Sequence, residues 1–182
     1  MPKRYRQTES FGALHTHDLG LKCPYKPYKG EKMNDLNDQA FLEYAISAAR
    51  QGASEGGVPI GGALVVEGKV LGVGFNKRVQ LGSAIRHGET DCLENIGRLP
   101  AKVYQKATMY TTLSPCHMCT GAILLYGIPR VVLGENETFM GAEDLLRSEG
   151  VEVINLNSQE CKDMMAKFIK EKPEVWNEDI GV

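Results

Sequence analysis

The chain has 182 residues, of which 42% are hydrophobic and 24% charged, an ordinary composition for one globular domain that excludes collagen-like and low-complexity classes. The formal net charge of −2 argues against a partner held mainly through phosphate neutralisation. No apolar run approaches the roughly 18 residues of a membrane-spanning helix, and the N-terminus lacks a hydrophobic secretion segment. We therefore expect a soluble cytoplasmic protein that could also occupy the nucleus.

Charge is unevenly distributed along the chain. Residues 1–36 carry seven Lys and Arg against four Asp and Glu, whereas residues 37–182 carry 14 against 19. The first segment has neither a helical nor a strand period, so it is predicted to be a flexible or loosely docked extension. The acidic remainder is predicted to be one domain with a small or uncharged ligand and no nucleic acid or membrane partner.

Apolar periodicity predicts five helices and five strands after the extension. The helices are expected at residues 38–52, 87–96, 116–126, 142–149 and 158–172, and the strands at residues 60–66, 70–75, 108–112, 130–134 and 151–154. The first two strands form an antiparallel hairpin around a short Gly-containing turn, and the later strands alternate with helices. This order predicts an α/β fold, a three-layer α/β/α sandwich with a mixed five-stranded sheet whose later strands are parallel.

Two short motifs contain candidate metal ligands, an H-x-E at residues 87–89 and a P-C-x-x-C at residues 115–119. Each is modest alone, because H-x-E is common by chance and C-x-x-C also occurs in redox pairs and structural zinc sites. No second C-x-x-C is present, so the chain offers three good ligands: His87, Cys116 and Cys119. Three protein ligands with an open fourth position are typical of catalytic zinc, and we predict one Zn²⁺ per chain.

The predicted positions of these residues support this interpretation. Ser114 suits an N-cap and Pro115 the first helical position, which places both cysteines in the first turn, where the positive end of the helix favours thiolates. Residues i and i+2 diverge on a helix, so Glu89 is not expected to bind the metal with His87. Glu89 is expected to reach toward the fourth position and to act as the catalytic proton shuttle.

H-x-E followed by P-C-x-x-C is the pattern of the zinc nucleobase deaminases. Beyond this pattern the chain resembles the fungal cytosine deaminases over roughly residues 37–182. The segments that carry the resemblance are residues 57–62, 76, 82–84, 87–89, 93–95, 111–116, 118–123, 126–130, 134–136 and 176–181.

The resemblance implies a homodimer that hydrolyses cytosine to uracil and ammonia in pyrimidine salvage, with some tolerance of 5-substituted cytosines. It implies that zinc-bound hydroxide attacks C4 while Glu89 protonates N3 and then the leaving amine. It also implies that Asn76 bonds the N1/O2 side of the base, that Asp179 accepts a hydrogen bond from the exocyclic amine, and that the Gly88 amide faces the base. The implied apolar wall and lid consist of Phe139, Trp176 and Ile180.

Some residues depart from the family pattern or lie outside the predicted site. Residues 90–92 are more polar than the pattern, and we expect Asp91 to face solvent or the dimer partner. His117 is expected to point away from zinc. The cysteines outside the motif are expected to be inert buried thiols: Cys23, Cys92 and Cys161.

Three alternatives remain open at this point. A tRNA adenosine deaminase shares the zinc pattern, although residues 37–182 lack the basic surface that RNA requires. A guanine deaminase or another small-heterocycle deaminase is the second alternative. The third is a non-catalytic scaffold that keeps zinc only for folding, in which Glu89, Asn76 and Asp179 would have no use.

Overall fold

The computed structural model describes residues 35–182, with side chains from Asp38 onward. The elements are α1 (Asp35–Ser54), β1 (Gly61–Val66), β2 (Lys69–Phe75), α2 (Arg78–Leu81), α3 (Gly88–Ile96), α4 (Ala101–Tyr104), β3 (Ala107–Leu113), α5 (His117–Tyr126), β4 (Arg130–Glu135), α6 (Glu143–Ser148), β5 (Glu152–Asn155), α7 (Gln159–Glu171) and α8 (Pro173–Ile180). The predicted extension lies outside the described residues except for its last two residues, which begin α1, and Cys23 lies outside them as well. Among residues 35–182 no helix has both the length and the apolar character of a membrane span.

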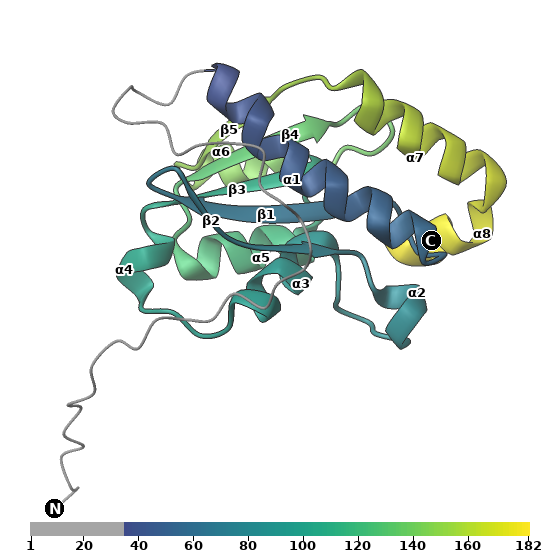
Figure 1. The fold of residues 1–182 in the computed structure, drawn as a ribbon, viewed down its shortest axis with the longest axis horizontal. Coiled ribbons are helices and arrows are strands. Elements are labelled where there is room, and N and C mark those ends of the chain that lie inside the picture. The colour runs from purple at the N-terminus through teal and green to yellow at the C-terminus, as the bar shows by residue number, and fades with distance from the viewer. Residues whose placement is uncertain (1–34) are drawn as a thin grey trace, which may run out of the picture.

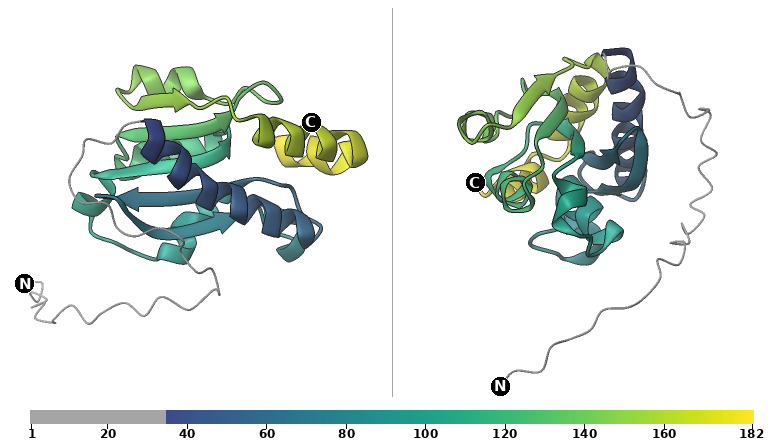
Figure 2. Two further views of the ribbon diagram at one scale, coloured as in Figure 1. Left: turned by 45° about the horizontal axis from the view of Figure 1, so that its top comes forward. Right: turned by 90° about the vertical axis from the view of Figure 1, so that its left-hand side faces the viewer.

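The five strands form one mixed sheet in the order β2-β1-β3-β4-β5. Strand β1 runs antiparallel to both β2 and β3, whereas β3, β4 and β5 are parallel to one another. Helices cover both faces, and α1 crosses in front of the sheet (Figure 1; two further views in Figure 2). The predicted three-layer sandwich is therefore confirmed.

The core lies on both sides of the central strand β3, which is buried along its whole length. Because successive strand residues point to opposite faces, Met109 packs in the layer formed with α3, α5 and α6, while Tyr110 packs in the layer formed with α1 and α7. A third cluster lies at the carboxyl end of β3, where Leu113 meets residues of α7 and α8. Ligands of open α/β sheets bind at this end of the strands.

Two glycines allow α3 to approach the sheet more closely than any side chain would permit. A Cβ atom on Gly62 would lie 2.9 Å from the carbonyl oxygen of Gly88, and one on Gly74 would lie 2.2 Å from the backbone nitrogen of Cys92. Since real Cβ contacts are longer, glycine at these two positions of β1 and β2 fixes the start of α3 directly against the sheet.

The chain adds a helix after the predicted final one. Helix α7 ends at Glu171, and Pro173 is the first residue of α8. Proline stops one helix but also suits the first position of the next, because its fixed φ is helical and the position needs no N–H donor. Helix α8 carries Trp176, which packs edge-on against Phe139 with ring centroids 5.8 Å apart. The short helices α2 and α4 were also not predicted.

The predicted start of α5 is wrong. The helix begins at His117 with Cys116 at the N-cap, and Ser114 is not its cap. Instead, the Ser114 hydroxyl donates to Glu143 (2.7 Å) and accepts the Gly141 N–H (3.0 Å). Ser114 has the local preference of an N-cap residue, but its hydroxyl bonds to the distant Glu143 and does not cap the helix.

Candidate metal centre and pocket

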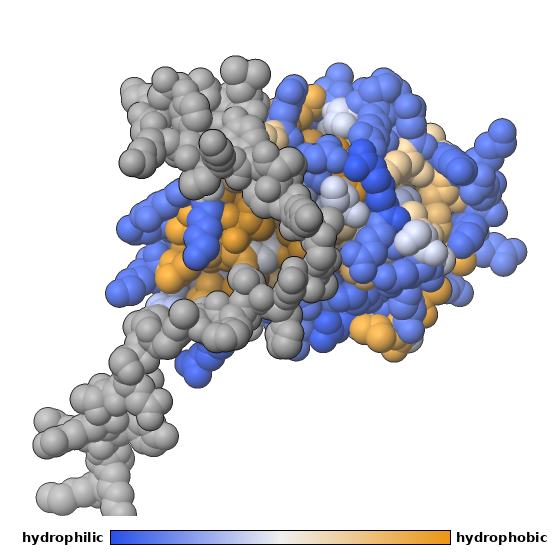
Figure 3. Space-filling model, viewed as in Figure 1, coloured by the Kyte–Doolittle hydropathy of each residue, from blue (hydrophilic) through white to orange (hydrophobic). Residues whose placement is uncertain are grey.

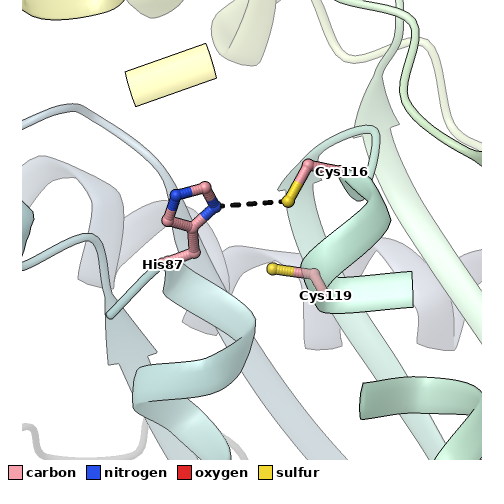
Figure 4. Close-up of side chains that lie close together, drawn as sticks. All are labelled: His87, Cys116 and Cys119. Atoms are coloured by element: carbon pink, nitrogen blue, oxygen red, sulfur yellow. Dashed lines mark hydrogen bonds between the residues drawn. The ribbon is translucent and has the colours of Figure 1, made fainter. Parts of the chain in front are cut away.

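Three candidate ligands converge where α3 and α5 begin. His87 is the N-cap of α3 and Cys116 the N-cap of α5, and Cys119 lies in the first turn of α5. Their ligand atoms all lie within 4.8 Å of one another, and no other such group of His, Cys, Asp or Glu occurs in the described chain. The two sulfur atoms face the Nδ1 edge of the imidazole ring (Figure 4).

The geometry fits a tetrahedral zinc ion. Ordinary Zn–S and Zn–N bonds at a tetrahedral angle place sulfur and nitrogen about 3.6 Å apart. The Cys116 sulfur and His87 Nδ1 are 3.5 Å apart. The hydrogen bond with Cys119 is the main reason why the pKa of the Cys116 thiol is lowered to about 4. Burial raises this pKa, but the hydrogen bond with His87 lowers it further. The set therefore contains a thiolate, the soft donor that zinc favours.

Glu89 lies beside the ligands and is 97% buried in the first turn of α3, with only 3% exposed. Its Oε1 accepts from the Thr111 hydroxyl (3.1 Å) and its Oε2 from the Cys119 thiol (3.3 Å). Burial raises the pKa of this carboxyl, and the neighbouring Cys116 raises it further. Glu89 is thus a carboxyl group that takes up a proton more readily than an exposed one.

A narrow pocket opens beside these side chains. Its empty space is about 280 Å³. The lining residues are Ile60, His87, Glu89, Leu113, Ser114, Cys116, Phe139, Trp176, Asp179 and Ile180. The fold thus brings seven of the predicted site residues to one pocket: His87, Glu89, Cys116, Phe139, Trp176, Asp179 and Ile180.

Asn76 and Gly88 are buried next to the pocket but are not among its lining residues. The Asn76 amide donates to both oxygens of Asp179, at 2.9 and 3.0 Å. The same carboxylate approaches the other edge of the His87 ring, with Nε2 3.9 Å from Oδ2. Burial alone lowers the pKa of His87, but the Cys116 sulfur and the Asp179 charge together raise it.

The comparisons with known proteins assign the chain to a family. Residues 35–135 match the model of the cytidine and deoxycytidylate deaminase zinc-binding region. The chain belongs to this family. It is 60% identical to a cytosine deaminase of Candida albicans over 147 residues, which cover 80% of this chain and 98% of the relative. The predicted resemblance to cytosine deaminases and the prediction of a zinc-dependent deaminase are thereby confirmed.

Other deaminases are more distant relatives. A tRNA-specific adenosine deaminase of Bacillus subtilis is 31% identical over 144 residues, covering 74% of this chain and 89% of the relative. A solved structure from a study of tRNA:A34 deaminases has a TM-score of 0.60 and 27% identity, and the match covers 69% of this chain and 99% of the other. The deaminase fold is shared throughout this group.

Two residues of this deaminase were misplaced or missed by the sequence interpretation. Asp91 does not face solvent: it is fully buried and ion-paired to Lys77 (2.9 Å) and Arg86 (2.8 Å). These two cations lie at the two ends of the loop between β2 and α3, and their meeting cannot be inferred from spacing alone. Arg78, which contacts Asp179, was not singled out at all. The only feature of the sequence that could have drawn attention to Arg78 is its position two residues after the predicted site residue Asn76.

The remaining predictions concern residues outside the pocket. His117 is exposed, and Cys92 and Cys161 are completely buried. Burial raises the pKa of Cys161 to about 11 and that of Cys92 further. Such thiols are unreactive at neutral pH, as expected from the sequence.

Proposed function

We propose that this chain hydrolyses free cytosine to uracil and ammonia and serves pyrimidine salvage. The observation that carries the proposal is a small pocket in which a zinc-compatible ligand set, a buried acid and a second carboxylate lie together. The 60% identity to a cytosine deaminase supports the choice of base.

The metal and Glu89 divide the chemistry between them. Zinc held by His87, Cys116 and Cys119 supplies a Lewis acid that makes water a nucleophile at neutral pH. Glu89 takes the first proton of the water and delivers it to N3 of the ring, then takes the second proton from the same oxygen, which becomes the C4 carbonyl, and passes it to the amine so that ammonia leaves. The raised pKa of Glu89 suits a group that must hold a proton between these transfers.

Asp179 is the proposed acceptor for the exocyclic amine, since it lines the same pocket as Glu89 and the metal ligands His87 and Cys116. Asn76 orients that carboxylate through its amide. A direct bond from Asn76 to the N1/O2 side of the base, and the contact from the Gly88 amide, stay predictions.

The narrow pocket favours a free base over a nucleoside or a polynucleotide. Trp176 and Ile180 of α8 line the pocket together with Phe139, and its empty space of about 280 Å³ suits a single base better than a base with a ribose. This argues against action on tRNA, the substrate named for the relatives at about 31% identity. A guanine deaminase and a zinc scaffold remain the alternatives to be tested.

Ammonia release from cytosine, cytidine, adenine and guanine separates these functions. We expect release from cytosine alone. Release from guanine or adenine but not cytosine would contradict the proposal. One bound zinc per chain with no release from any of the four compounds would favour the scaffold.

We also propose that the protein is a homodimer joined through the α5–α6 face. Helices α5 and α6 pack side by side, and the solvent-facing side chains there include Leu125, which is 79% exposed, Tyr126 and Leu145. Apolar side chains gathered on one face mark an interaction surface. Light scattering is expected to show two copies, and Leu125→Asp to give monomers. The extension of residues 1–36, the domain of residues 37–182 and the cytoplasmic or nuclear location stay predictions.

A further inference from the structure

One arginine links the loop after β2 to the C-terminal helix. Arg78 begins α2, and its guanidinium Nη1 donates to the Glu178 carbonyl of α8 (2.9 Å), 100 residues later, and to Asp179 Oδ1 (3.3 Å). Its Nε donates to the Ser83 carbonyl (3.3 Å), and its backbone N–H donates to Asn76 Oδ1 (3.0 Å). Arg78 therefore contacts both polar residues proposed to serve the substrate, as well as the helix that closes the pocket.

The position of α8 relative to this loop depends on few polar contacts. The hydrogen bonds that run from the loop to α8 come from Asn76 and Arg78 alone among the described residues, and they end on Glu178 and Asp179. Elsewhere α8 is held by apolar packing of Trp176 with residues of α7 and the sheet end. A short helix with so few polar contacts depends strongly on each of them.

The charge of Arg78 acts on both of its partners. A hydrogen bond between a guanidinium and a carboxylate is stronger than one between neutral groups, and here it directs one oxygen of a carboxylate that is 7% exposed. The Glu178 carbonyl lies in the last turn of α8, where the partial negative charge of the helix end attracts a cation. The same side chain thus orients Asp179 and holds the end of α8.

Arg78 also lines a surface groove that shares Asp179 with the pocket. A groove with about 600 Å³ of empty space runs between α2 and α8, lined by Arg78, Val79, Gly82, Ser83, Ala84, Val175, Glu178 and Asp179. Asp179 lines both this groove and the narrow pocket. Figure 3 shows apolar side chains at the solvent surface near α2, and Val79 and Leu81 of this helix are exposed.

We propose that Arg78 is a positioning residue that fixes Asp179 and α8 over the pocket and thereby sets the affinity for the base. The proposal rests on the function proposed above. Arg78 contacts neither the metal ligands nor Glu89, so loss of its charge reaches them only through Asp179, which lies 3.9 Å from His87 Nε2, whereas it directly frees the acceptor of the exocyclic amine and the covering helix. The consequence is weaker binding with little change in the chemical step.

The chain offers a matched control. Arg50 also bridges two helices: it pairs with Glu43 of α1 and with Glu160 of α7, far from the pocket lining. Arg50→Gln removes a bridging guanidinium and its ion pairs without touching a pocket residue. A purely structural role for Arg78 predicts that Arg78→Gln and Arg50→Gln behave alike.

The experiment compares Arg78→Gln, Arg78→Lys and Arg50→Gln with the unchanged chain. It measures KM and kcat for cytosine, zinc content, and hydrogen exchange of the α8 amides. We expect Arg78→Gln to raise KM about 10- to 100-fold, the range of one charged hydrogen bond. We also expect faster exchange in α8, with unchanged zinc content and kcat changed less than about threefold. Arg78→Lys keeps the positive charge but loses the planar guanidinium with its several donors, so its KM should lie between those of Arg78→Gln and the unchanged chain.

Two outcomes overturn the inference: KM and α8 exchange in Arg78→Gln equal to those in Arg50→Gln, or a fall in kcat at unchanged KM. Failure of the proposed function is distinguishable from both. If the unchanged chain releases no ammonia from cytosine, that function is wrong. The exchange of α8 in Arg78→Gln then decides by itself whether Arg78 holds the helix.

Discussion

Replacement of Glu89 by glutamine separates proton transfer from metal binding. The amide keeps the length of the side chain, and its carbonyl oxygen can still accept from the Thr111 hydroxyl, 3.1 Å away in the structure. It cannot take up a proton at neutral pH. General acid–base catalysis contributes about 10²- to 10⁴-fold. Because the same side chain serves two transfers here, we expect the upper part of that range, about 10³- to 10⁴-fold in kcat.

The assay combines ammonia release with zinc content measured by atomic absorption. Glu94→Gln is the control, since Glu94 lies on the same helix with its side chain 68% exposed. We expect Glu89→Gln and Glu89→Ala to retain one zinc per chain and the fold, and Glu94→Gln to retain full activity. The reasoning is refuted if Glu89→Gln loses its metal, which would make Glu89 a ligand, or keeps more than about a tenth of the activity.

Three further predictions follow from other parts of the chain. Cys119→Ala is expected to abolish both zinc binding and activity, because it removes a fully buried donor of the three-ligand set; retention of stoichiometric zinc would contradict this. Asp38→Asn is expected to lower the free energy of unfolding at pH 7 by about 1.5–3 kcal/mol, because it removes the buried carboxylate charge that pairs with Arg130 and leaves that guanidinium only the exposed Glu152. Burial alone raises the pKa of Asp38, but Arg130 and Tyr110 bring it below its usual 3.8, so the stabilisation is complete above that pH and is lost as the pH falls below it; a difference between the two proteins that does not shrink in acid urea titrations would refute this. Deletion of residues 1–30 is expected to leave kcat/KM for cytosine nearly unchanged, because the pocket is lined, within residues 35–182, by side chains between Ile60 and Ile180, and a tenfold loss would assign the extension to the site or the dimer.

The sequence predicts well what is determined locally. The apolar periods of α1, α3, α5 and α7 and the runs of the five strands specify the layers, because each element buries one face or stripe. The candidate metal ligands are likewise local features, since His87 and Cys116 each precede a helix and Cys119 follows within one turn. Only the proximity of the starts of α3 and α5 depends on the tertiary fold. It could be inferred from the sequence because one histidine and two cysteines are together a typical zinc ligand set.

Contacts between distant parts of the chain were not predictable in the same way. Ser114 has the local character of a helix cap, yet Glu143, 29 residues later, takes its hydroxyl. Asp91 has the character of a surface residue, yet two cations neutralise it in the core. The contact between Arg78 and Asp179 joins residues 101 positions apart. In each case the structural role of the residue depends on a partner that is distant in the sequence, and the periodicity of the sequence does not identify that partner.

The backbone contact between Gly62 and Gly88 determines where His87 lies, although neither glycine is a candidate metal ligand. Zinc tolerates errors of about 0.2 Å in its bond lengths. A single methyl group on Gly62, 2.9 Å from the Gly88 oxygen, would have to push the start of α3 outward by several tenths of an ångström, and His87 with it. A residue that never touches the ion thus governs how well the ion fits, and a small change there should be detected first as weaker zinc retention rather than as unfolding.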